Sequence, residues 1–146
     1  MKLIYSKIKP SRLLHLVHRL EEIESLSTKD GLARINVAPV EEHLQLATLH
    51  MDEGRTFKPH KHIYKEGEKE VIAQESWIVV KGSVKVVMYD LDDTIIDQII
   101  LNPGDCSMTF SGGHNYVIQE DNTIVYEYKT GPYKGIENDK VSINEI

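Results

Sequence analysis

The stretch Glu75–Tyr89, ESWIVVKGSVKVVMY, holds two runs of β-branched and aromatic residues separated by Lys81-Gly82. Such residues favour strands, and a short break that contains glycine between two runs is typical of a β-hairpin. We therefore expect one strand over Glu75–Val80, a second over Ser83–Tyr89, and a hairpin turn between them.

Similar short runs continue on both sides of this stretch, each bounded by turn residues. Strands spaced this closely, without intervening helical patterns, are typical of an all-β sandwich or closed barrel, and 146 residues suit one domain. The further strands expected are Leu44–Met51, Thr94–Leu101, Tyr116–Gln119 and Thr123–Lys129. Of these, Tyr116–Gln119 and Thr123–Lys129 are expected to form another hairpin.

The N-terminal residues have a different pattern, in which apolar side chains recur at helical spacing after a candidate N-cap at Ser11. We expect a short amphipathic α-helix that ends near Ser25–Gly31, and a division into an N-terminal helical segment (1–32) and a barrel domain (33–146). The helix would pack on the barrel or on a second subunit, and exposed edge strands make a homodimer the expected assembly. The apolar positions are Leu13, Leu16, Val17, Leu20 and Ile23.

Composition excludes several classes of partner. With 17 basic and 23 acidic side chains the net charge is -6, which argues against nucleic acid or an anionic membrane as a partner. Cys106 is the single cysteine, so no intramolecular disulfide is possible. No apolar run approaches the ~18–20 residues of a membrane helix, and no secretory signal is recognisable, so a cytoplasmic protein is expected.

His60-Lys61-His62 places two imidazoles two residues apart on an extended segment, where both point to the same face. Strand alternation puts Glu75 on the same face as Trp77, so its carboxylate would be buried, which is costly unless it is paired or bound to a metal. His114 could supply a fourth ligand. Three imidazoles and a carboxylate suit one divalent ion such as Fe, Mn, Ni or Zn, with a coordination position left open.

The spacing of these residues resembles the first motif of the cupin superfamily. Gly54 is followed by five residues and then by His60-Lys61-His62, and Glu75 is followed by six residues and then by Gly82. The chain departs from the motif in the gap between His62 and Glu75, where the twelve residues 63–74 replace three or four. This insert is expected to be a longer loop between two strands, and it is also a candidate lid over the barrel mouth.

The second cupin motif is recognisable but altered. Pro103-Gly104 resembles its opening, whereas Phe110 stands where the motif has proline. His114 comes one residue early, and Ile118 replaces the final asparagine. These departures make His114 the least secure of the four expected ligands.

The resemblance implies a single-domain double-stranded β-helix, or jelly-roll barrel, with a short N-terminal α-helix. It also implies a metal-dependent enzyme of the isomerase, epimerase or dioxygenase type, acting on a small polar molecule such as a sugar derivative. A non-catalytic module that binds a small ligand or metal is the alternative. The chain is also similar to small cupins associated with bacterial surface-polysaccharide gene clusters, partly through residues 126–135.

Other side chains have weaker signals. Tyr116 shares the face of His114, where it would either transfer a proton or fill the barrel with its hydroxyl bonded. Arg55 and Lys58 are candidates for holding an anionic substrate, against ordinary surface solvation. Trp77 would be core or a stacking wall for a ring-shaped ligand. His15 and His18 are expected to lie on a solvated edge of the helix rather than to share a metal ion. Cys106 is expected to be a small buried residue.

Overall fold

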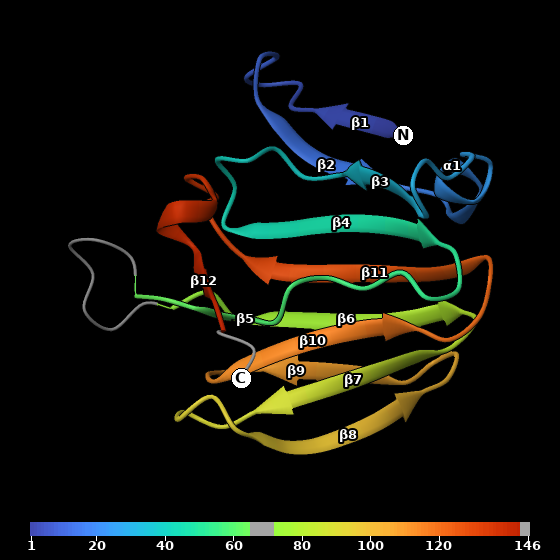
Figure 1. Cartoon of the computed structure of the whole chain (residues 1–146). Coiled ribbons are helices and arrows are strands. Elements are labelled where there is room, and N and C mark those ends of the chain that lie inside the picture. The colour runs from blue at the N-terminus through green and yellow to red at the C-terminus, as the bar shows by residue number, and fades with distance from the viewer. Residues whose placement is uncertain (65–71, 144–146) are drawn as a thin grey trace.

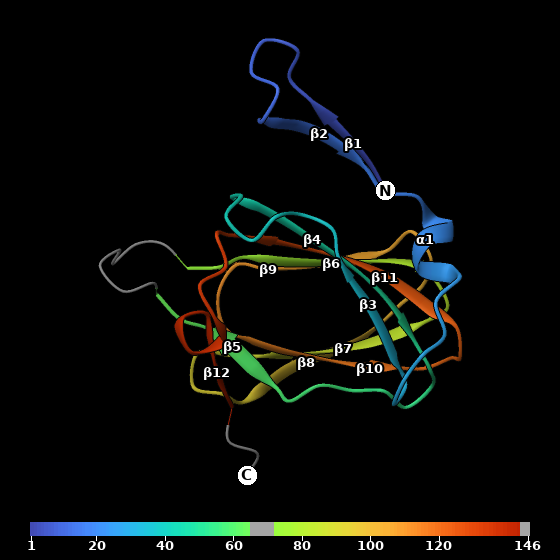
Figure 2. The same ribbon diagram turned by 90° about the horizontal axis from the view of Figure 1, so that it is seen from above.

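A computed structural model describes residues 1–64 and 72–143 of the protein, and in these ranges two five-stranded sheets face each other (Figures 1 and 2). The first sheet has the order β12 (Lys140–Ser142), β5 (His60–His62), β10 (Gly113–Ile118), β7 (Val84–Tyr89) and β8 (Ile95–Leu101). The second has the order β3 (Leu32–Asn36), β4 (Leu44–Met51), β11 (Thr123–Thr130), β6 (Glu75–Lys81) and β9 (Cys106–Thr109). The all-β, jelly-roll prediction is confirmed.

The expected strands lie where the sequence predicts them, but two expected pairings are wrong. β6 and β7 do not form a hairpin, because β6 pairs with β11 and β9 in one sheet while β7 pairs with β10 and β8 in the other. β10 and β11 are likewise divided between the sheets. The turn at Asp90–Asp93, by contrast, joins two strands that do pair, β7 and β8.

Packing at one end of the sandwich explains why these turns are corners rather than hairpins. Gly82 has a φ of +77°, and a Cβ at this position would collide with the side chain of Thr123. The Thr123 hydroxyl in turn donates to the Glu120 carbonyl at 2.7 Å and accepts from the Ser83 amide at 3.3 Å. The two corners therefore contact each other, and each carries the chain from one sheet to the opposite sheet.

The core fills the space between the inner faces of the sheets. Strand alternation follows the prediction for β6, because Glu75, Trp77 and Val79 are buried while the residues between them are partly exposed. Burial of this apolar surface is the main driving force for the fold. The buried core cluster consists of Ala47, Leu49, Met51, Trp77, Val79, Val84, Val86, Leu101, Tyr116, Ile118 and Val125.

The expected N-terminal helix is present but short, and the extent that we expected for it is wrong. The helix α1 spans only Leu20–Glu24. Its N-cap is Arg19 instead of Ser11, and the Arg19 amide donates to the Glu22 carboxylate at 2.8 Å. The preceding residues form strand β2 (Leu13–Val17), antiparallel to β1 (Lys2–Tyr5). The apolar spacing that predicts a helix does not prevent an extended conformation when a neighbouring segment can pair with it as a strand.

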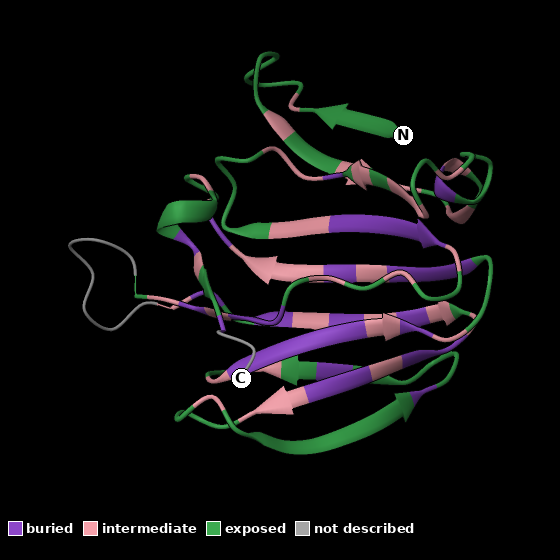
Figure 3. Ribbon diagram, in the orientation of Figure 1, coloured by how far each residue is buried: buried purple, intermediate pink, exposed green. Residues whose placement is uncertain are grey.

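The β1–β2 hairpin stands apart from the two sheets and is largely exposed (Figures 2 and 3). β8 is also exposed, because every residue before Leu101 in this strand is exposed. Cys106, expected to be buried, is exposed at the start of β9. Within residues 1–64 and 72–143, no helix combines the length and the apolar character needed to cross a membrane.

Candidate metal centre

Four side chains converge between the two sheets, and they are the four predicted from the sequence. Their candidate ligand atoms lie within 4.8 Å of one another, and the group consists of His60, His62, Glu75 and His114. The histidines come from β5 and β10 of the first sheet, and Glu75 is the first residue of β6 in the second sheet. The sandwich therefore brings the carboxylate against the three imidazoles from the opposite side.

Strand register explains the position of each histidine. His60 and His62 are two residues apart on β5, so both rings point toward the barrel interior. His114 on β10 lies directly opposite His60 in the antiparallel pair, and the two ring centroids are 4.7 Å apart. The altered spacing of the second motif thus does not remove His114 from the group.

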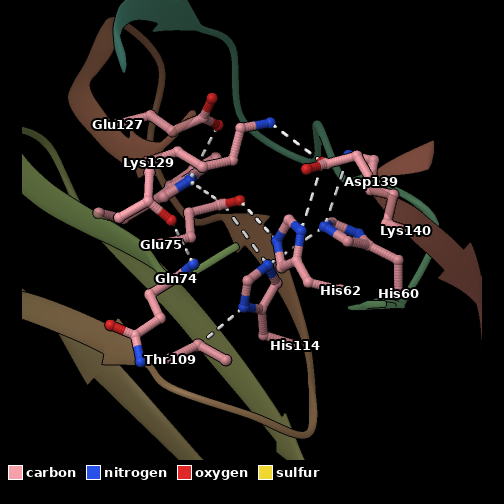
Figure 4. A network of polar contacts seen from close by, with 12 residues as sticks. His60, His62, Gln74, Glu75, Thr109, His114, Glu127, Lys129, Asp139 and Lys140 are labelled. Carbon is pink, nitrogen blue, oxygen red and sulfur yellow. Dashed lines mark hydrogen bonds and ion pairs between the residues drawn. The ribbon is translucent and has the colours of Figure 1, made fainter. Parts of the chain in front are cut away.

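The imidazole nitrogens that face inward are all Nε2. His62 Nε2 lies 3.0 Å from Glu75 Oε2, and His114 Nε2 lies 3.5 Å from Glu75 Oε1 and 3.2 Å from His60 Nε2 (Figure 4). The two oxygens of Glu75 are thus shared between His62 and His114. Glu75 Oε1 also accepts a hydrogen bond from Trp77 Nε1 at 3.0 Å, which fixes the orientation of the carboxylate.

Each outward-facing Nδ1 has an oxygen partner of its own. His60 Nδ1 donates to the Lys58 carbonyl at 3.0 Å, and His114 Nδ1 lies 2.8 Å from the Thr109 hydroxyl. His62 Nδ1 lies 3.3 Å from Asp139 Oδ2, within ion-pair distance but outside hydrogen-bond geometry. Histidines that bind metals almost always present their second nitrogen to such a partner, which fixes the tautomer and leaves the other nitrogen free to coordinate. The four residues could therefore hold a divalent metal ion.

Electrostatics divides the histidines into two kinds. Burial, followed by the charges of His114 and Lys140, lowers the pKa of His60 to about 4. Burial also lowers the pKa of His114 to about 4, although the Glu75 charge opposes this. These two imidazoles are therefore neutral at pH 7, the state in which imidazole coordinates a metal.

His62 and Glu75 form a charged pair instead. Burial alone would lower the pKa of His62, but its contacts with Asp139 and Glu75 outweigh this effect and raise that pKa to about 9. Burial would raise the pKa of Glu75, but the hydrogen bond from His62 and the charge of His114 hold it far below its usual value. Without a metal, the His62 imidazolium therefore lies between two carboxylates.

A cavity with a volume of about 720 Å³ opens beside this group, and His60 and Glu75 form part of its wall. This volume lies within the range of ordinary small-molecule sites. Trp77 and Tyr116 line the cavity with their rings stacked, 3.8 Å apart between centroids and 3° from parallel. The rest of the wall mixes apolar side chains such as Val40, Leu46 and Ile136 with charged ones: Arg34, Lys58, Glu127, Lys129, Glu137 and Lys140.

The structure brings some of the other predicted residues to the cavity and not others. Lys58 lines it, as expected for an anion-binding candidate, whereas Arg55 stacks over Phe57 and donates to the Asp30 carbonyl. His18 instead contacts the Thr48 hydroxyl at 3.2 Å and Glu22 at 3.0 Å, and the metal-ligand group does not include it. The expected lid falls mostly on residues 65–71, which lie outside the described residues.

The C-terminal segment contributes residues that sequence reasoning missed. β12 pairs with β5 so that Lys140 lies opposite His62, and the preceding residue is Asp139. Lys129 Nζ lies 3.2 Å from Asp139 Oδ2, which completes a chain of contacts to His62 (Figure 4). No motif or spacing marks these residues, because the contact depends on a strand pairing between segments about 80 residues apart.

Comparisons with known proteins agree with this architecture. No protein-family model matches the sequence, and no curated protein matches it. Among solved structures, KdgF from Halomonas sp. is 21% identical, with a TM-score of 0.57 over 75% of this chain and 87% of that one. A double-stranded β-helix protein from Klebsiella pneumoniae is 13% identical, with a TM-score of 0.64 over 90% of this chain and 100% of that one.

A structure described as a cupin superfamily protein, from Desulfitobacterium hafniense, is 10% identical, with a TM-score of 0.56 over 80% of this chain and 94% of that one. The chain has the cupin fold. The capsular polysaccharide assembling protein CapF from Staphylococcus aureus matches with a TM-score of 0.66 at 14% identity, over 82% of this chain. The match spans only 31% of CapF, so the cupin fold of this chain corresponds to about a third of that protein.

Proposed function

We propose that this cupin is a metal-dependent enzyme that acts on a small polar molecule. One observation carries the proposal: three buried histidines have their outer nitrogens within 3.3 Å of oxygen atoms while their inner nitrogens and Glu75 converge beside a cavity. A purely structural cluster has no need of a polar cavity at its side. A working metal site, by contrast, keeps one position accessible to substrate or water.

The residues of the chain would divide the work as follows. His60, His62, His114 and Glu75 would hold the ion, which supplies Lewis-acid or redox chemistry. Trp77 and Tyr116 form a flat aromatic wall beside it. The Trp77 indole N–H donates to Glu75 and to Glu127, at 3.0 and 3.1 Å, and thereby links the ligand carboxylate to a polar group of the cavity wall.

The catalytic role expected for Tyr116 stays a proposal, and the geometry limits it. Burial raises the pKa of Tyr116, so the phenol stays protonated near neutral pH, where it can donate a hydrogen bond but cannot act as a base. Its hydroxyl also lies 2.9 Å from the Ser107 hydroxyl, which holds it in place. We propose Tyr116 as a hydrogen-bond or proton donor toward a ligand in the cavity.

Two reaction classes fit such a site. An isomerase or epimerase would use the ion as a Lewis acid, whereas a dioxygenase would require iron. We favour a sugar-derived substrate, because the cavity is lined by many charged and amide side chains and because CapF, of similar fold, is described as a capsular polysaccharide assembling protein. The identity of the bound metal would separate the two classes.

The first test is elemental analysis of the purified protein beside a His60→Ala/His62→Ala double variant. We expect near-stoichiometric divalent metal in the parent and its loss in the variant. Lys61→Met is the matched control, because Lys61 lies between the two histidines but pairs with Asp93 at 2.6 Å on the opposite face. Negligible metal in the parent after reloading would refute the metalloenzyme proposal and favour a ligand-binding module.

We also propose that the protein forms a homodimer through the β1–β2 hairpin. An isolated two-stranded hairpin is marginally stable in water, yet this one exposes large apolar side chains, including Leu3, Tyr5 and Leu14 at 46–49%. Residues 1–17 also carry only basic charges (Lys2, Lys7, Lys9 and Arg12) in a chain with 23 acidic and 17 basic side chains. The hairpin is therefore complementary in charge to the rest of a second copy.

Light scattering coupled to size-exclusion chromatography tests this assembly. The parent is expected to run as a dimer, and Leu3→Asp/Leu14→Asp is expected to be monomeric with an unchanged barrel. Leu91→Asp is the control, since Leu91 is 73% exposed in the β7–β8 turn. A monomeric parent at micromolar concentration would contradict the proposal.

A further inference from the structure

Lys140 places an ammonium group at the metal centre itself. Its Nζ lies 3.5 Å from His60 Nε2, the nitrogen that faces the other ligands, and the side chain lines the cavity (Figure 4). The position is fixed by the backbone, because β12 pairs with β5 and Lys140 lies opposite His62. The positive charge of Lys140 therefore belongs to β12, the strand paired with β5, and does not come from a surface loop.

The other charges of the cavity wall are mostly compensated. Arg34 Nη2 donates to Glu127 at 2.8 Å, and Lys129 pairs with Asp139 at 3.2 Å. Within residues 1–64 and 72–143, neither Lys58 nor Lys140 lies within ion-pair distance of a carboxylate. Among the described residues, these two cavity lysines have no carboxylate partner, and Lys140 contacts His60, a candidate ligand.

A divalent ion held by His60, His62, Glu75 and His114 would leave a net positive charge, since Glu75 is the only anionic ligand among them. A second cation in contact with this group is unfavourable unless an anion lies between them. Asp139 is already engaged by His62 and Lys129, and Glu127 by Arg34. Of the described carboxylates that line the cavity, Glu137 has no ion pair, but it has no contact with Lys140 or with the four candidate ligands either. An anionic group of a bound molecule would therefore supply negative charge between Lys140 and the metal.

We propose that the ligand of this cavity is a small hydroxylated carboxylate, whose carboxylate group lies between the metal and Lys140, with Lys58 as a second cationic contact. Charge-assisted hydrogen bonds to a carboxylate are short and strong, which suits recognition of one anionic group in a polar cavity. The hydroxyl groups would face the amide and acidic side chains of the wall, such as Asn36, Gln45 and Glu127. This inference rests on the metal centre proposed above and names its substrate class.

The test uses the full-length protein loaded with Co(II). Calorimetry follows binding of glycolate, lactate and D-gluconate, with D-glucitol as the neutral analogue of gluconate. We expect at least one acid to bind and D-glucitol not to bind. Lys140→Met is expected to weaken the binding of that acid roughly tenfold or more, as for loss of a hydrogen bond to a charged group. Lys140→Arg is expected to restore most of the affinity.

A second readout needs no organic ligand. Because Lys140→Met removes a like charge, it is expected to tighten Co(II) binding in the absence of acid, by roughly two- to fivefold. Lys61→Met, in which the lysine points away from the site and pairs with Asp93, is expected to change neither affinity. The opposite signs for metal and acid would not arise from a general loss of folding.

The outcomes separate the two proposals. Failure of the parent to bind Co(II) would overturn the metal centre and this inference together. Co(II) binding without binding of any of the acids, equal binding of D-glucitol and D-gluconate, or an unchanged acid affinity in Lys140→Met would overturn the inference alone and leave the metal centre in place.

Discussion

Metal binding should release one proton, and that proton should come from His62. In the metal-free protein His62 lies 3.0 Å from Glu75 and 3.3 Å from Asp139, with its pKa raised to about 9, whereas His60 and His114 have pKa values lowered to about 4. Of these three histidines, only His62 is therefore charged at pH 7. A metal must displace its Nε2 proton, and two pH units between 7 and 9 correspond to about 3 kcal/mol of lost binding free energy.

Calorimetric titration with Zn(II) in buffers of different ionisation enthalpy measures this proton directly. We expect about one proton released per metal at pH 7. The apparent dissociation constant should fall about tenfold per pH unit until the pH reaches the pKa of His62, and should level off above it. Asp139→Asn removes one of the two carboxylate partners of His62, so it should move the point of levelling to lower pH.

The reasoning fails if no proton is released at pH 7, because His62 would then be neutral between two carboxylates. It also fails if two or more protons are released, because His60 or His114 would then be charged despite their burial. Lys61→Met should reproduce the parent titration, since Lys61 pairs with Asp93 away from the site.

Three further predictions follow from contacts of the same region and the core. Above pH 9, where proton competition has ended, Asp139→Asn should weaken metal binding roughly 10- to 100-fold through loss of His62 orientation, as measured by chelator competition. Tyr116→Phe should lower the free energy of unfolding by about 1–2 kcal/mol in urea, since Ser107 loses its buried partner. If the phenol also transfers a proton, turnover of any identified substrate should fall roughly 100-fold or more. The melting temperature of the EDTA-treated protein should be highest near pH 6.5. The lowered pKa values of His60 and His114 remove stability as the pH falls from 6.5 through 4, and the raised pKa of His62 removes it as the pH rises through 9. A flat melting profile across this range would contradict the histidine assignments.

The sequence predicts strand positions well here and strand pairing poorly. A run such as Ser83–Tyr89 has the same alternation whether it folds back on Glu75–Val80 or crosses to the opposite sheet. The difference lies in a long-range contact, in which the corner at Gly82 packs on Thr123. The N-terminal helix shows the same limit, because Leu13–Val17 takes its conformation from pairing with β1.

The cluster of candidate metal ligands could be predicted because local geometry alone brings part of the set together. His60 and His62 share a face by strand periodicity, and the burial of Glu75 follows from its alternation with Trp77. Asp139 and Lys140 could not be found in this way. Their role depends on the pairing of β12 with β5, which no short motif records.

These missed residues give the site its charge balance. Asp139 contacts the outer nitrogen of His62, and Lys140 contacts the inner nitrogen of His60, so adjacent residues of one strand edge act on two sides of the ligand strand. Asp139 adds a negative charge beside the outward-facing nitrogen of His62, and Lys140 adds a positive charge beside the inward-facing nitrogen of His60. The four candidate ligands could hold a divalent ion, whereas the residues around the C-terminal strand set part of the charge that a bound molecule would meet in the cavity. Chemistry specific to this chain should therefore be sought in residues 139–140 rather than in the four candidate ligands.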